Sequence, residues 1–453
     1  MLLLRTRYKR IHFVGIGGSG MSGIAEVLHN MGFIITGSDI SKSNNTIRLE
    51  NMGIKIYYEH NPENVLNKDI VVYSSAISFD NPELLKAQEL NIPVIPRAEM
   101  LAEIMRVKFS IAVSGAHGKT TTTSMIGYAI KELDPTIVVG GILKGIESNV
   151  KLGKSDFIVV EADESDKSFL KLNPSIAVIT NIDKEHLDNY KNLIDIKLAF
   201  LEFANSTPFY GAVIINIDDL NNRDIIPFIQ KRIITYGIDD NALIKAKNIE
   251  LKELGSTYDL YIENKYFSKV HLRVPGIHNV KNSLAAIATA YELDLELNKS
   301  IENLYEFTGV RRRFEIKGNF GKALIIDDYG HHPTEIENVI NTAKTYFKKP
   351  LLIVFQPHRY TRTKFLYNEF AQALSRADEI ILLPIYSAGE KPIPGISSEL
   401  IYNKLKNLGV NTKIFENKED VIKYLKKYKN SDIIILTLGA GDVYKVGEEL
   451  LKE

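Results

Sequence analysis

Residues 110–123 read Ser-Ile-Ala-Val-Ser-Gly-Ala-His-Gly-Lys-Thr-Thr-Thr-Thr and join a short apolar run to a glycine-containing loop. Lysine between glycine and threonine is typical of a P-loop. Backbone N–H groups there surround phosphate, the lysine reaches the β- and γ-phosphates, and the hydroxyl binds Mg²⁺. The strict pattern has glycine where this chain has Val113, so the loop is a shortened variant. The stretch predicts a nucleotide-binding α/β domain in which Lys119 and Thr120 act on bound phosphate.

Working outward, short apolar runs alternate with amphipathic stretches along most of the chain. Continuous runs of this kind suit parallel strands buried on both faces, and their alternation with helical patterns indicates βαβ units. The expected strands are 11–14, 34–36, 70–73, 110–113, 137–139, 157–160, 176–180, 213–216, 323–326, 351–355, 380–383 and 433–436. Residues 243–275 alternate with period two instead, which predicts a small antiparallel sheet.

Two breaks in this pattern divide the chain. One contains Pro93, Pro96 and residues 105–108, and the other is Thr308–Gly309, just before the arginine cluster 311–313. The sequence therefore predicts three domains, 1–107, 108–310 and 311–453. The P-loop falls in the central domain.

Composition narrows the class of protein. The 453 residues are 45% hydrophobic and 25% charged, with Lys+Arg and Asp+Glu equal at 56 each, so charge does not favour nucleic acid as a partner. Cysteine is absent, which excludes disulfides, thiolate zinc sites and a cysteine nucleophile. The apolar runs are too short for membrane insertion, and the N-terminus lacks the order of a signal peptide. We expect a cytoplasmic enzyme, monomeric or homodimeric.

A second glycine-rich loop lies near the N-terminus. The expected strand 11–14 leads into Gly15-Ile-Gly17-Gly18-Ser19-Gly20, and Asp39 ends the next strand. Strand, glycine turn and helix together favour a diphosphate at the helix N-terminus, and an acid near position 39 suits a ribose. The residues leave open whether the ligand is NAD or another diphosphate such as a UDP-sugar.

Acidic residues follow the buried strand 157–160. Glu161 comes first and is the expected Mg²⁺ ligand, whereas Asp163, Glu164 and Asp166 could form a solvated turn. His186 follows the strand 176–180 and is expected to bind a second Mg²⁺. Both positions lie at carboxyl ends of strands, where open α/β sheets bind ligands.

The chain resembles the Mur ligase family over essentially its whole length. Besides the two loops, the resemblance rests on these motifs: Glu161-Ala-Asp-Glu-Ser-Asp, Thr180-Asn-Ile-Asp-Lys-Glu-His, Gly276-Ile-His-Asn-Val-Lys-Asn, Gly309-Val-Arg-Arg-Arg-Phe-Glu, Asp327-Asp-Tyr-Gly-His-His-Pro-Thr and Phe355-Gln-Pro-His-Arg-Tyr-Thr-Arg-Thr. The first loop and the last two motifs are similar to those of the member that adds L-alanine.

The resemblance implies a UDP-binding Rossmann-like N-terminal domain, a central ATPase and a Rossmann-like C-terminal domain. It implies ATP and Mg²⁺ as cofactors, and it favours UDP over NAD at the first loop. Residues implied to bind ATP are Gly115, Ala116, His117, Gly118, Lys119, Thr120, Thr121, His278, Asn279, Asn282, Arg313 and Asp328. Residues implied to bind the sugar nucleotide or the amino acid are Gly15, Gly17, Gly18, Ser19, Gly20, Asp39, Ser74, Ser75, Tyr329, His331, Arg359 and Arg362. Metal ligands would be Thr120, Glu161 and His186, and the catalytic groups Lys119, His331, His358, Arg359 and Arg362.

The implied reaction joins L-alanine to the lactyl carboxylate of UDP-N-acetylmuramate through an acyl phosphate, in peptidoglycan precursor synthesis. Two unit charges about 4 Å apart repel by about 4 kcal/mol at an effective dielectric of about 20, so attack of a carboxylate on ATP needs Lys119 and Mg²⁺. Arg359 and Arg362 would share a helix face and suit the carboxylate of the amino acid.

Other functions remain open from the sequence. An NAD-dependent oxidoreductase would explain the first loop but not the P-loop, and a nucleotide switch or transport ATPase would ignore the amino acid. A ligase that recycles murein tripeptide is the nearest alternative. Lys197 lies roughly where sister ligases carry a carbamylated lysine, although an unmodified surface lysine is the favoured interpretation.

Overall fold

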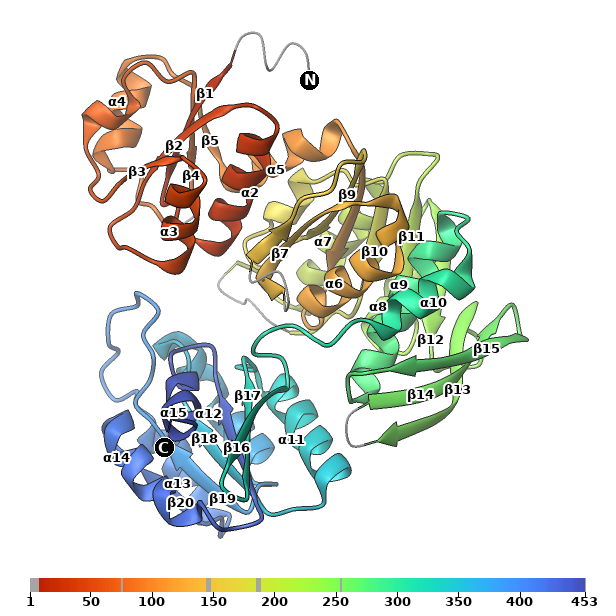
Figure 1. The fold of residues 1–453 in the computed structure, drawn as a ribbon, viewed down its shortest axis with the longest axis vertical. Coiled ribbons are helices and arrows are strands. Elements are labelled where there is room, and N and C mark those ends of the chain that lie inside the picture. Colours follow the sequence, from red (N-terminus) through yellow and green to blue (C-terminus); the bar gives the residue numbers. More distant parts are fainter. Residues whose placement is uncertain (1–7, 75, 144–147, 185–188, 253–254, 453) are drawn as a thin grey trace. The chain divides into compact units, whose positions relative to one another are not determined.

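The computed structural model describes residues 8–74, 76–143, 148–184, 189–252 and 255–452. Its strands form sheets of five, ten and six strands, which confirms the predicted α/β fold class (Figure 1). Most residues of the first two sheets belong to one compact unit. The third sheet belongs to a second unit, which consists of residues 309–453 together with the short segments 251–256 and 274–278. The domain boundaries at 107 and 310 stay predictions.

The five-stranded sheet is parallel, with the order β3-β2-β1-β4-β5. Its strands are β1 (Arg10–Val14), β2 (Ile34–Ser38), β3 (Lys55–Tyr57), β4 (Ile70–Tyr73) and β5 (Val94–Pro96). Its helices are α2 (Ser19–Asn30), α3 (Asn44–Asn51), the short η1 (Pro62–Val65), α4 (Pro82–Glu89) and α5 (Arg97–Arg106). The order reverses between β1 and β4, and in open α/β sheets ligands bind at the carboxyl ends of the strands at such a point.

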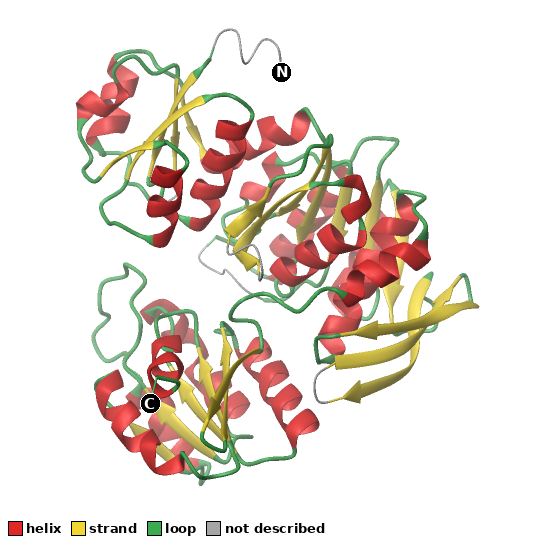
Figure 2. Cartoon of the chain, viewed as in Figure 1, coloured by secondary structure: helices red, strands yellow, loops and turns green. Residues whose placement is uncertain are grey.

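Side chains of β1 alternate between two apolar layers. Ile11 and Phe13 pack in the core with α2 and α5, whereas Val14 packs with Leu84 of α4. Both faces of this sheet are therefore covered, and Figure 2 shows helices beside the strands of all three sheets. This double burial explains the continuous apolar runs in the sequence.

The ten-stranded sheet has the order β15-β14-β13-β12-β11-β10-β6-β9-β7-β8. Its strands are β6 (Phe109–Ser114), β7 (Thr136–Leu143), β8 (Ser148–Lys151), β9 (Phe157–Glu161), β10 (Ile176–Ile179), β11 (Ala212–Asn216), β12 (Arg232–Gly237), β13 (Ile244–Lys252), β14 (Gly255–Ile262) and β15 (Lys265–Leu272). The helices of this part are α6 (Lys119–Ala129), η2 (Lys131–Leu133), η3 (Ser168–Lys171), α7 (Leu193–Asn205), α8 (Leu220–Ile225), η4 (Ile226–Phe228), α9 (Ile277–Glu292) and α10 (Leu297–Tyr305).

The predicted antiparallel strands are present as β13–β15, and they extend the parallel sheet at one edge. Tyr236 of β12 pairs in parallel with Ile244 of β13. Glu263 and Asn264 join β14 to β15 with φ of 49° and 66°, as a two-residue turn with both central residues at positive φ requires. The hairpin therefore continues the sheet and does not form a separate one.

The six-stranded sheet has the order β16-β17-β21-β18-β19-β20, in which β16 is antiparallel and the others are parallel. Its strands are β16 (Glu315–Phe320), β17 (Ala323–Asp328), β18 (Leu351–Phe355), β19 (Glu379–Leu382), β20 (Thr412–Ile414) and β21 (Ile434–Leu438). Helices α11 (Pro333–Phe347), α12 (Tyr360–Leu374) and α13 (Glu399–Asn407) pack in one apolar layer. Helices α14 (Lys418–Leu425) and α15 (Tyr444–Leu450) pack in the other.

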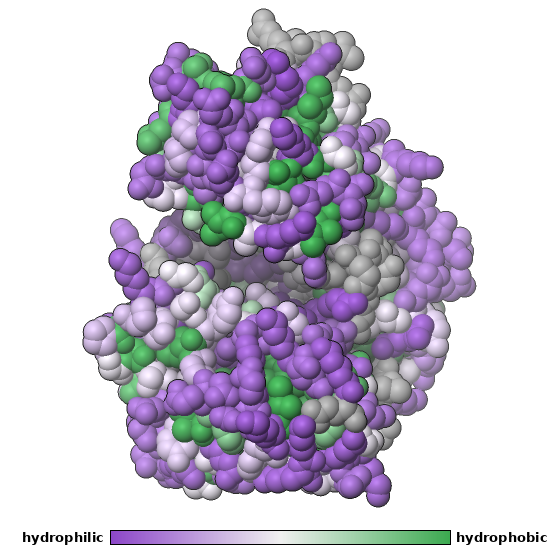
Figure 3. Space-filling view, turned by 60° about the vertical axis from the view of Figure 1, so that its left-hand side comes forward, coloured by the Kyte–Doolittle hydropathy of each residue, from purple (hydrophilic) through white to green (hydrophobic). Residues whose placement is uncertain are grey.

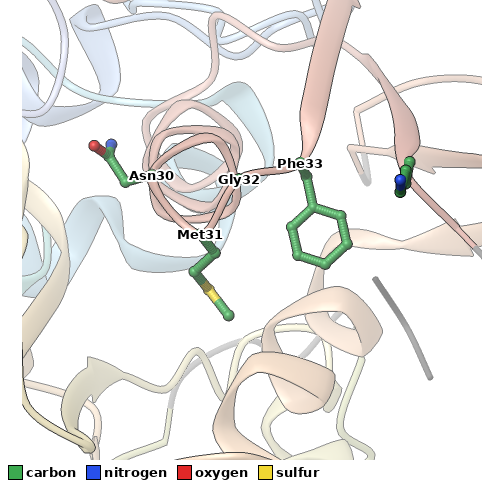
Figure 4. A pocket seen from close by; sticks show the side chains of 5 residues that line it. Asn30, Met31, Gly32 and Phe33 are labelled. Carbon is green, nitrogen blue, oxygen red and sulfur yellow. The ribbon is translucent and has the colours of Figure 1, made fainter. Parts of the chain in front are cut away.

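The surface is mainly hydrophilic on the face drawn in Figure 3, where hydrophobic residues form small groups. Among the described residues, no helix combines the length and the apolar character needed to cross a membrane. A small hollow is lined by Lys9 and by residues 30–33, where α2 ends and the chain turns into β2 (Figure 4). It lies at the amino ends of the strands, opposite the glycine loop, so it is not the predicted ligand site.

Candidate functional site

The P-loop connects β6 to α6 in the predicted strand–loop–helix order. Gly115 has a φ of 144°, and a Cβ atom there would lie 2.0 Å from Thr180 Oγ1. Gly118 has a φ of 82° and precedes α6 as its N-cap. Glycine is therefore required at both positions, and the loop presents backbone N–H groups at a helix N-terminus, where an anion binds favourably.

Lys119 lies at the start of α6 with its ammonium group among oxygen atoms. Its Nζ donates to Gly115 O at 2.7 Å and to Glu164 Oε1 at 2.8 Å. Burial would lower the pKa of Lys119, but the charges of Glu164, Asp163 and Glu161 outweigh it and raise the pKa above its usual value. The side chain is therefore a permanent cation inside the loop.

The acidic residues after β9 differ in their surroundings. Glu161 Oε2 accepts the Gly140 N–H at 2.7 Å, Asp163 Oδ1 accepts the Ser165 N–H, and Asp166 is exposed. Glu164 is only 2% exposed. The alternative of a solvated turn is therefore wrong for Glu164. Its carboxylate is buried against Lys119, a tertiary contact that the sequence alone did not indicate.

The segment after β10 packs against the P-loop and forms hydrogen bonds with it. His117 O accepts hydrogen bonds from Thr180 Oγ1 at 2.7 Å and from Asn181 Nδ2 at 3.0 Å, and the His117 N–H donates to Asn181 Oδ1. The His117 ring lies 3.2 Å from Asp183 Oδ2. Thr180, Asn181 and Asp183 stand in the predicted motif but were given no role there. His186 lies outside the described residues.

Helix α9 brings its two predicted asparagines to α6. Thr122 Oγ1 donates to Asn282 Oδ1 at 3.0 Å, and Asn282 Nδ2 donates to Asn279 Oδ1. A Cβ atom on Gly118 would lie 3.0 Å from Asn282 Oδ1. Asn279 and Asn282 therefore lie beside the P-loop helix, where Thr120 and Thr121 are also buried.

The first glycine loop is tied to the end of β2. The N–H groups of Gly15 and Ile16 both donate to Ser38 O, at 2.8 and 3.0 Å, and the Gly17 N–H donates to Asp39 Oδ2 at 2.8 Å. The Asp39 carboxylate thus contacts the loop backbone itself.

Ser74 follows β4, on the other side of β1. A Cβ atom on Gly15 would lie 3.3 Å from Ser74 Cβ, so the first loop and Ser74 are neighbours. Gly18 precedes α2 as its N-cap, and Gly20 lies in the first turn of that helix against Arg97. Ser75 and the side chain of Ser19 lie outside the described residues.

The residues predicted to act on the amino-acid substrate lie together at the carboxyl ends of the strands of the six-stranded sheet. The Tyr329 and His331 rings, after β17, are 5.5 Å apart between centroids. His331 lies 5.7 Å from the ring of His358, which follows β18. Arg362 Nη1 lies 3.2 Å from His358 Nδ1. Arg359 precedes α12 as its N-cap, one turn before Arg362.

Burial controls the charge of this cluster. It lowers the pKa of His331 to about 3 and, together with Arg362 and Arg359, that of His358 to about 4. Both rings are therefore neutral at pH 7 and can accept a hydrogen bond through a ring nitrogen. Burial raises the pKa of Asp328 to about 6, although the charge of Arg313 and hydrogen bonds from two backbone N–H groups lower it in part. Asp328 is therefore mainly ionised at pH 7.

Two further predicted residues lie in the same unit. Arg313 Nη1 donates to Glu335 Oε1 at 3.3 Å, and its guanidinium lies over the Tyr329 ring at 5.5 Å. His278 is half-buried, and desolvation together with Arg313 lowers its pKa to about 4.

Tyr386 was not predicted from the sequence. Its ring stacks on His358 at 5.7 Å, its carbonyl accepts the Arg359 N–H, and it is 40% exposed. Lys197, the lysine considered for carbamylation, pairs with Asp224 at 2.6 Å.

The fold and the two loops define a multidomain α/β protein with a phosphate loop of the P-loop type. Three segments match family patterns, described as the Mur ligase family catalytic domain (residues 10–109), the Mur ligase middle domain (113–290) and the Mur ligase glutamate ligase domain (312–441).

Known proteins also match the chain over nearly its full length. A UDP-N-acetylmuramate–L-alanine ligase from Sulfurihydrogenibium sp. is 48% identical over 99% of both chains. The crystal structure of a UDP-N-acetylmuramate–alanine ligase from Thermotoga maritima matches with a TM-score of 0.83 and 31% identity over 98% of both chains. A murein peptide ligase from Psychrobacter arcticus shares the fold, with a TM-score of 0.72 and 22% identity over 98% of both chains. The chain belongs to the Mur ligase family.

Proposed function

We propose that this chain joins L-alanine to the lactyl carboxylate of UDP-N-acetylmuramate at the expense of ATP. The observation that carries the proposal is the 48% identity, over nearly the full length, to a ligase named for that reaction. The formed P-loop and the histidine–arginine cluster after β17 and β18 support it. Both nucleotide substrates are cytoplasmic metabolites, so the proposal places the enzyme in the cytoplasm.

The first step activates the sugar-linked carboxylate. A carboxylate oxygen attacks the γ-phosphorus of ATP, the bond to the bridging oxygen breaks, and ADP leaves with its electron pair. Both reactants are anionic, so the cationic Lys119 lowers the barrier by neutralising charge on the β- and γ-phosphates. To do so its ammonium exchanges Glu164 for phosphate oxygen.

Magnesium fits the oxygen donors around the P-loop. Thr120 lies in the first turn of α6, and Glu161 is the last residue of β9, the strand that pairs with β6. Oxygen ligands suit Mg²⁺, which would neutralise phosphate charge when bound. Glu164 and Asp163 add negative charge at the same place and favour a cation there.

The second step forms the amide. The amine of L-alanine attacks the acyl carbon, a tetrahedral intermediate forms, and phosphate leaves. The amine loses its proton to solvent, and neutral His358 or His331 can accept a hydrogen bond from its N–H, because both rings are unprotonated at pH 7 and their lowered pKa makes them weak bases. Arg359 and Arg362 hold the carboxylate of the amino acid, which a guanidinium can bind through two hydrogen bonds.

Phosphate release with ATP, Mg²⁺ and UDP-N-acetylmuramate tests the proposal. We expect release with L-alanine and little with no amino acid. Preference for the tripeptide L-Ala-γ-D-Glu-meso-diaminopimelate would assign the chain to the recycling ligases instead. Release that is indifferent to both the sugar nucleotide and the amino acid would refute the ligase assignment.

A further inference from the structure

A buried carboxylate lies beneath the first glycine loop and has no role in the reaction described above. Glu83, in the first turn of α4, has a fully buried side chain. Its Oε1 accepts from Asn64 Nδ2 at 2.7 Å and lies 3.3 Å from His12 Nε2. Its Oε2 accepts from Ser38 Oγ at 2.6 Å and lies 2.8 Å from His60 Nδ1. We call these five residues the Glu83 cluster.

The cluster joins segments that are distant in sequence. His12 lies in β1, Ser38 ends β2, His60 follows β3, Asn64 lies in η1, and Glu83 lies in α4. On β1, His12 and Val14 point to the same side, toward α4, at a position where the neighbouring strand β4 places apolar Val71. The polar side chain of His12 therefore lies in the otherwise apolar layer between β1 and α4, next to the glycine loop.

The cluster reaches the loop through Ser38. The carbonyl of Ser38 accepts the N–H groups of Gly15 and Ile16, and the next residue, Asp39, accepts the Gly17 N–H. Three consecutive amides of the loop therefore depend on where the end of β2 lies. The Ser38 hydroxyl donates a hydrogen bond to Glu83, and this bond holds the end of β2 in place.

Stability alone does not explain this arrangement. Replacing a buried charged network by well-packed apolar side chains is often neutral or stabilising. Burial opposes ionisation of Glu83, but hydrogen bonds from His12, Ser38 and Asn64 outweigh it and lower the pKa of the carboxyl group. An ionised acceptor of this kind holds its donors in a defined geometry.

We propose that Glu83 is a positioning residue for the UDP-sugar: through Ser38, its carboxylate fixes the loop amides and Asp39 in the geometry that receives the diphosphate. This inference rests on the proposed function, in which the first loop binds the sugar nucleotide. It adds a determinant of sugar-nucleotide affinity that lies on α4, outside both phosphate loops.

The substitution Glu83→Gln tests the proposal. Glutamine keeps the shape but offers one acceptor oxygen and turns two N–H donors toward groups that already donate. Displaced supporting groups commonly cost about tenfold or more in binding, so we expect the Kd for UDP and the KM for UDP-N-acetylmuramate to rise by about tenfold. The KM values for ATP and L-alanine should change by less than about twofold, because those sites lie elsewhere.

Two further variants separate positioning from stability. Asp69→Asn is the matched control: Asp69 accepts the N–H groups of Lys9 and Arg10 at 2.8 and 2.7 Å, at the opposite edge of the same sheet. It should lower the melting temperature without raising the Kd for UDP. Ser38→Ala removes only the connecting hydroxyl, and the double variant with Glu83→Gln should match Glu83→Gln alone, because both act along one path.

The outcomes are distinguishable. An unchanged Kd for UDP in Glu83→Gln, with a lowered melting temperature, would overturn the positioning role and leave the proposed function intact. If Glu83→Gln does not fold, Ser38→Ala decides alone: an unchanged Kd overturns the inference and a raised one supports it. Failure of the unsubstituted protein to bind UDP or UDP-N-acetylmuramate would instead remove the proposed function and, with it, the inference.

Discussion

Replacing Lys119 by methionine separates its contribution to stability from its contribution to catalysis. Lys119 Nζ lies 2.8 Å from Glu164 Oε1, and both side chains are largely buried, at 15% and 3% exposure. At that distance two unit charges attract by about 6 kcal/mol at an effective dielectric of about 20. Desolvation offsets part of this, and breaking a buried pair on one side typically costs about 3–5 kcal/mol.

The expected result is a large shift in melting temperature together with loss of activity. One kcal/mol changes the melting temperature by about 2–4 °C in domains of about 150–250 residues, so Lys119→Met should lower it by about 6 °C or more. The transition is measured by calorimetry without nucleotide. Loss of one preorganised charge contact costs about 10²–10³ in kcat, and we expect phosphate release to fall at least that far.

The double variant with Glu164→Gln tests the reasoning. It removes both charges, so most of the lost melting temperature should return while phosphate release stays low. Lys131→Met is the control, because Lys131 forms an exposed pair with Glu306 and should shift the transition by no more than about 1 kcal/mol. A double variant that melts as low as Lys119→Met would refute the ion-pair account, and one that regains activity would refute the role of Lys119 on phosphate.

Three other predictions follow from the site geometry. Gly115→Ala should abolish ATP binding, measured by calorimetric titration, because its Cβ would meet Thr180 at 2.0 Å; unaltered binding would contradict the observed loop. Arg359→Lys should raise the KM for L-alanine more than that for ATP, since lysine lacks the two-pronged contact; equal increases would argue against direct contact. The pKa of His358 is lowered to about 4 from 6.5, so the unfolded chain binds more protons in this window and stability falls as pH drops from about 6.5 to 4. The variant His358→Gln should show a shallower fall in melting temperature over that range, and an identical slope would count against the neutral ring.

The sequence predicted the strands that are buried on both faces, because such strands need continuous apolar runs. The predicted bounds of β4 and β18 agree with the structure residue for residue. Strands β3, β5 and β20 were not predicted: each has three residues, lies at the edge of its sheet and pairs with one neighbour. Strands β8, β12 and β16 were not predicted either, and none of them contains an apolar run of more than two residues. Sheet edges place little demand on local sequence, so their positions depend on the strand beside them.

The features of the candidate site also fall into two groups, those indicated by local sequence and those that depend on tertiary contacts. The strand–loop–helix form of both glycine loops could be predicted, because glycine spacing, the preceding strand and the following helix are local features. The burial of Glu164 depends on Lys119, 45 positions away, and the stacking of Tyr386 on His358 depends on the pairing of segments after β18 and β19. Contacts of this kind are tertiary, and no spacing rule in a single sequence indicates them.

The two loops also differ in what their side chains contact, and the difference follows from their chemistry. In the first loop, Asp39 holds the Gly17 amide, and in the P-loop, Asn181 holds the amide of His117, so both backbones are fixed by the end of a neighbouring strand. Lys119 is different, because its partner Glu164 is a carboxylate that a phosphate oxygen can replace. Since the acids raise the pKa of Lys119 above its usual value, the lysine is already protonated before ATP arrives. In the proposed reaction, the Lys119 ammonium would exchange the Glu164 carboxylate for a phosphate oxygen, and its protonation state would stay unchanged.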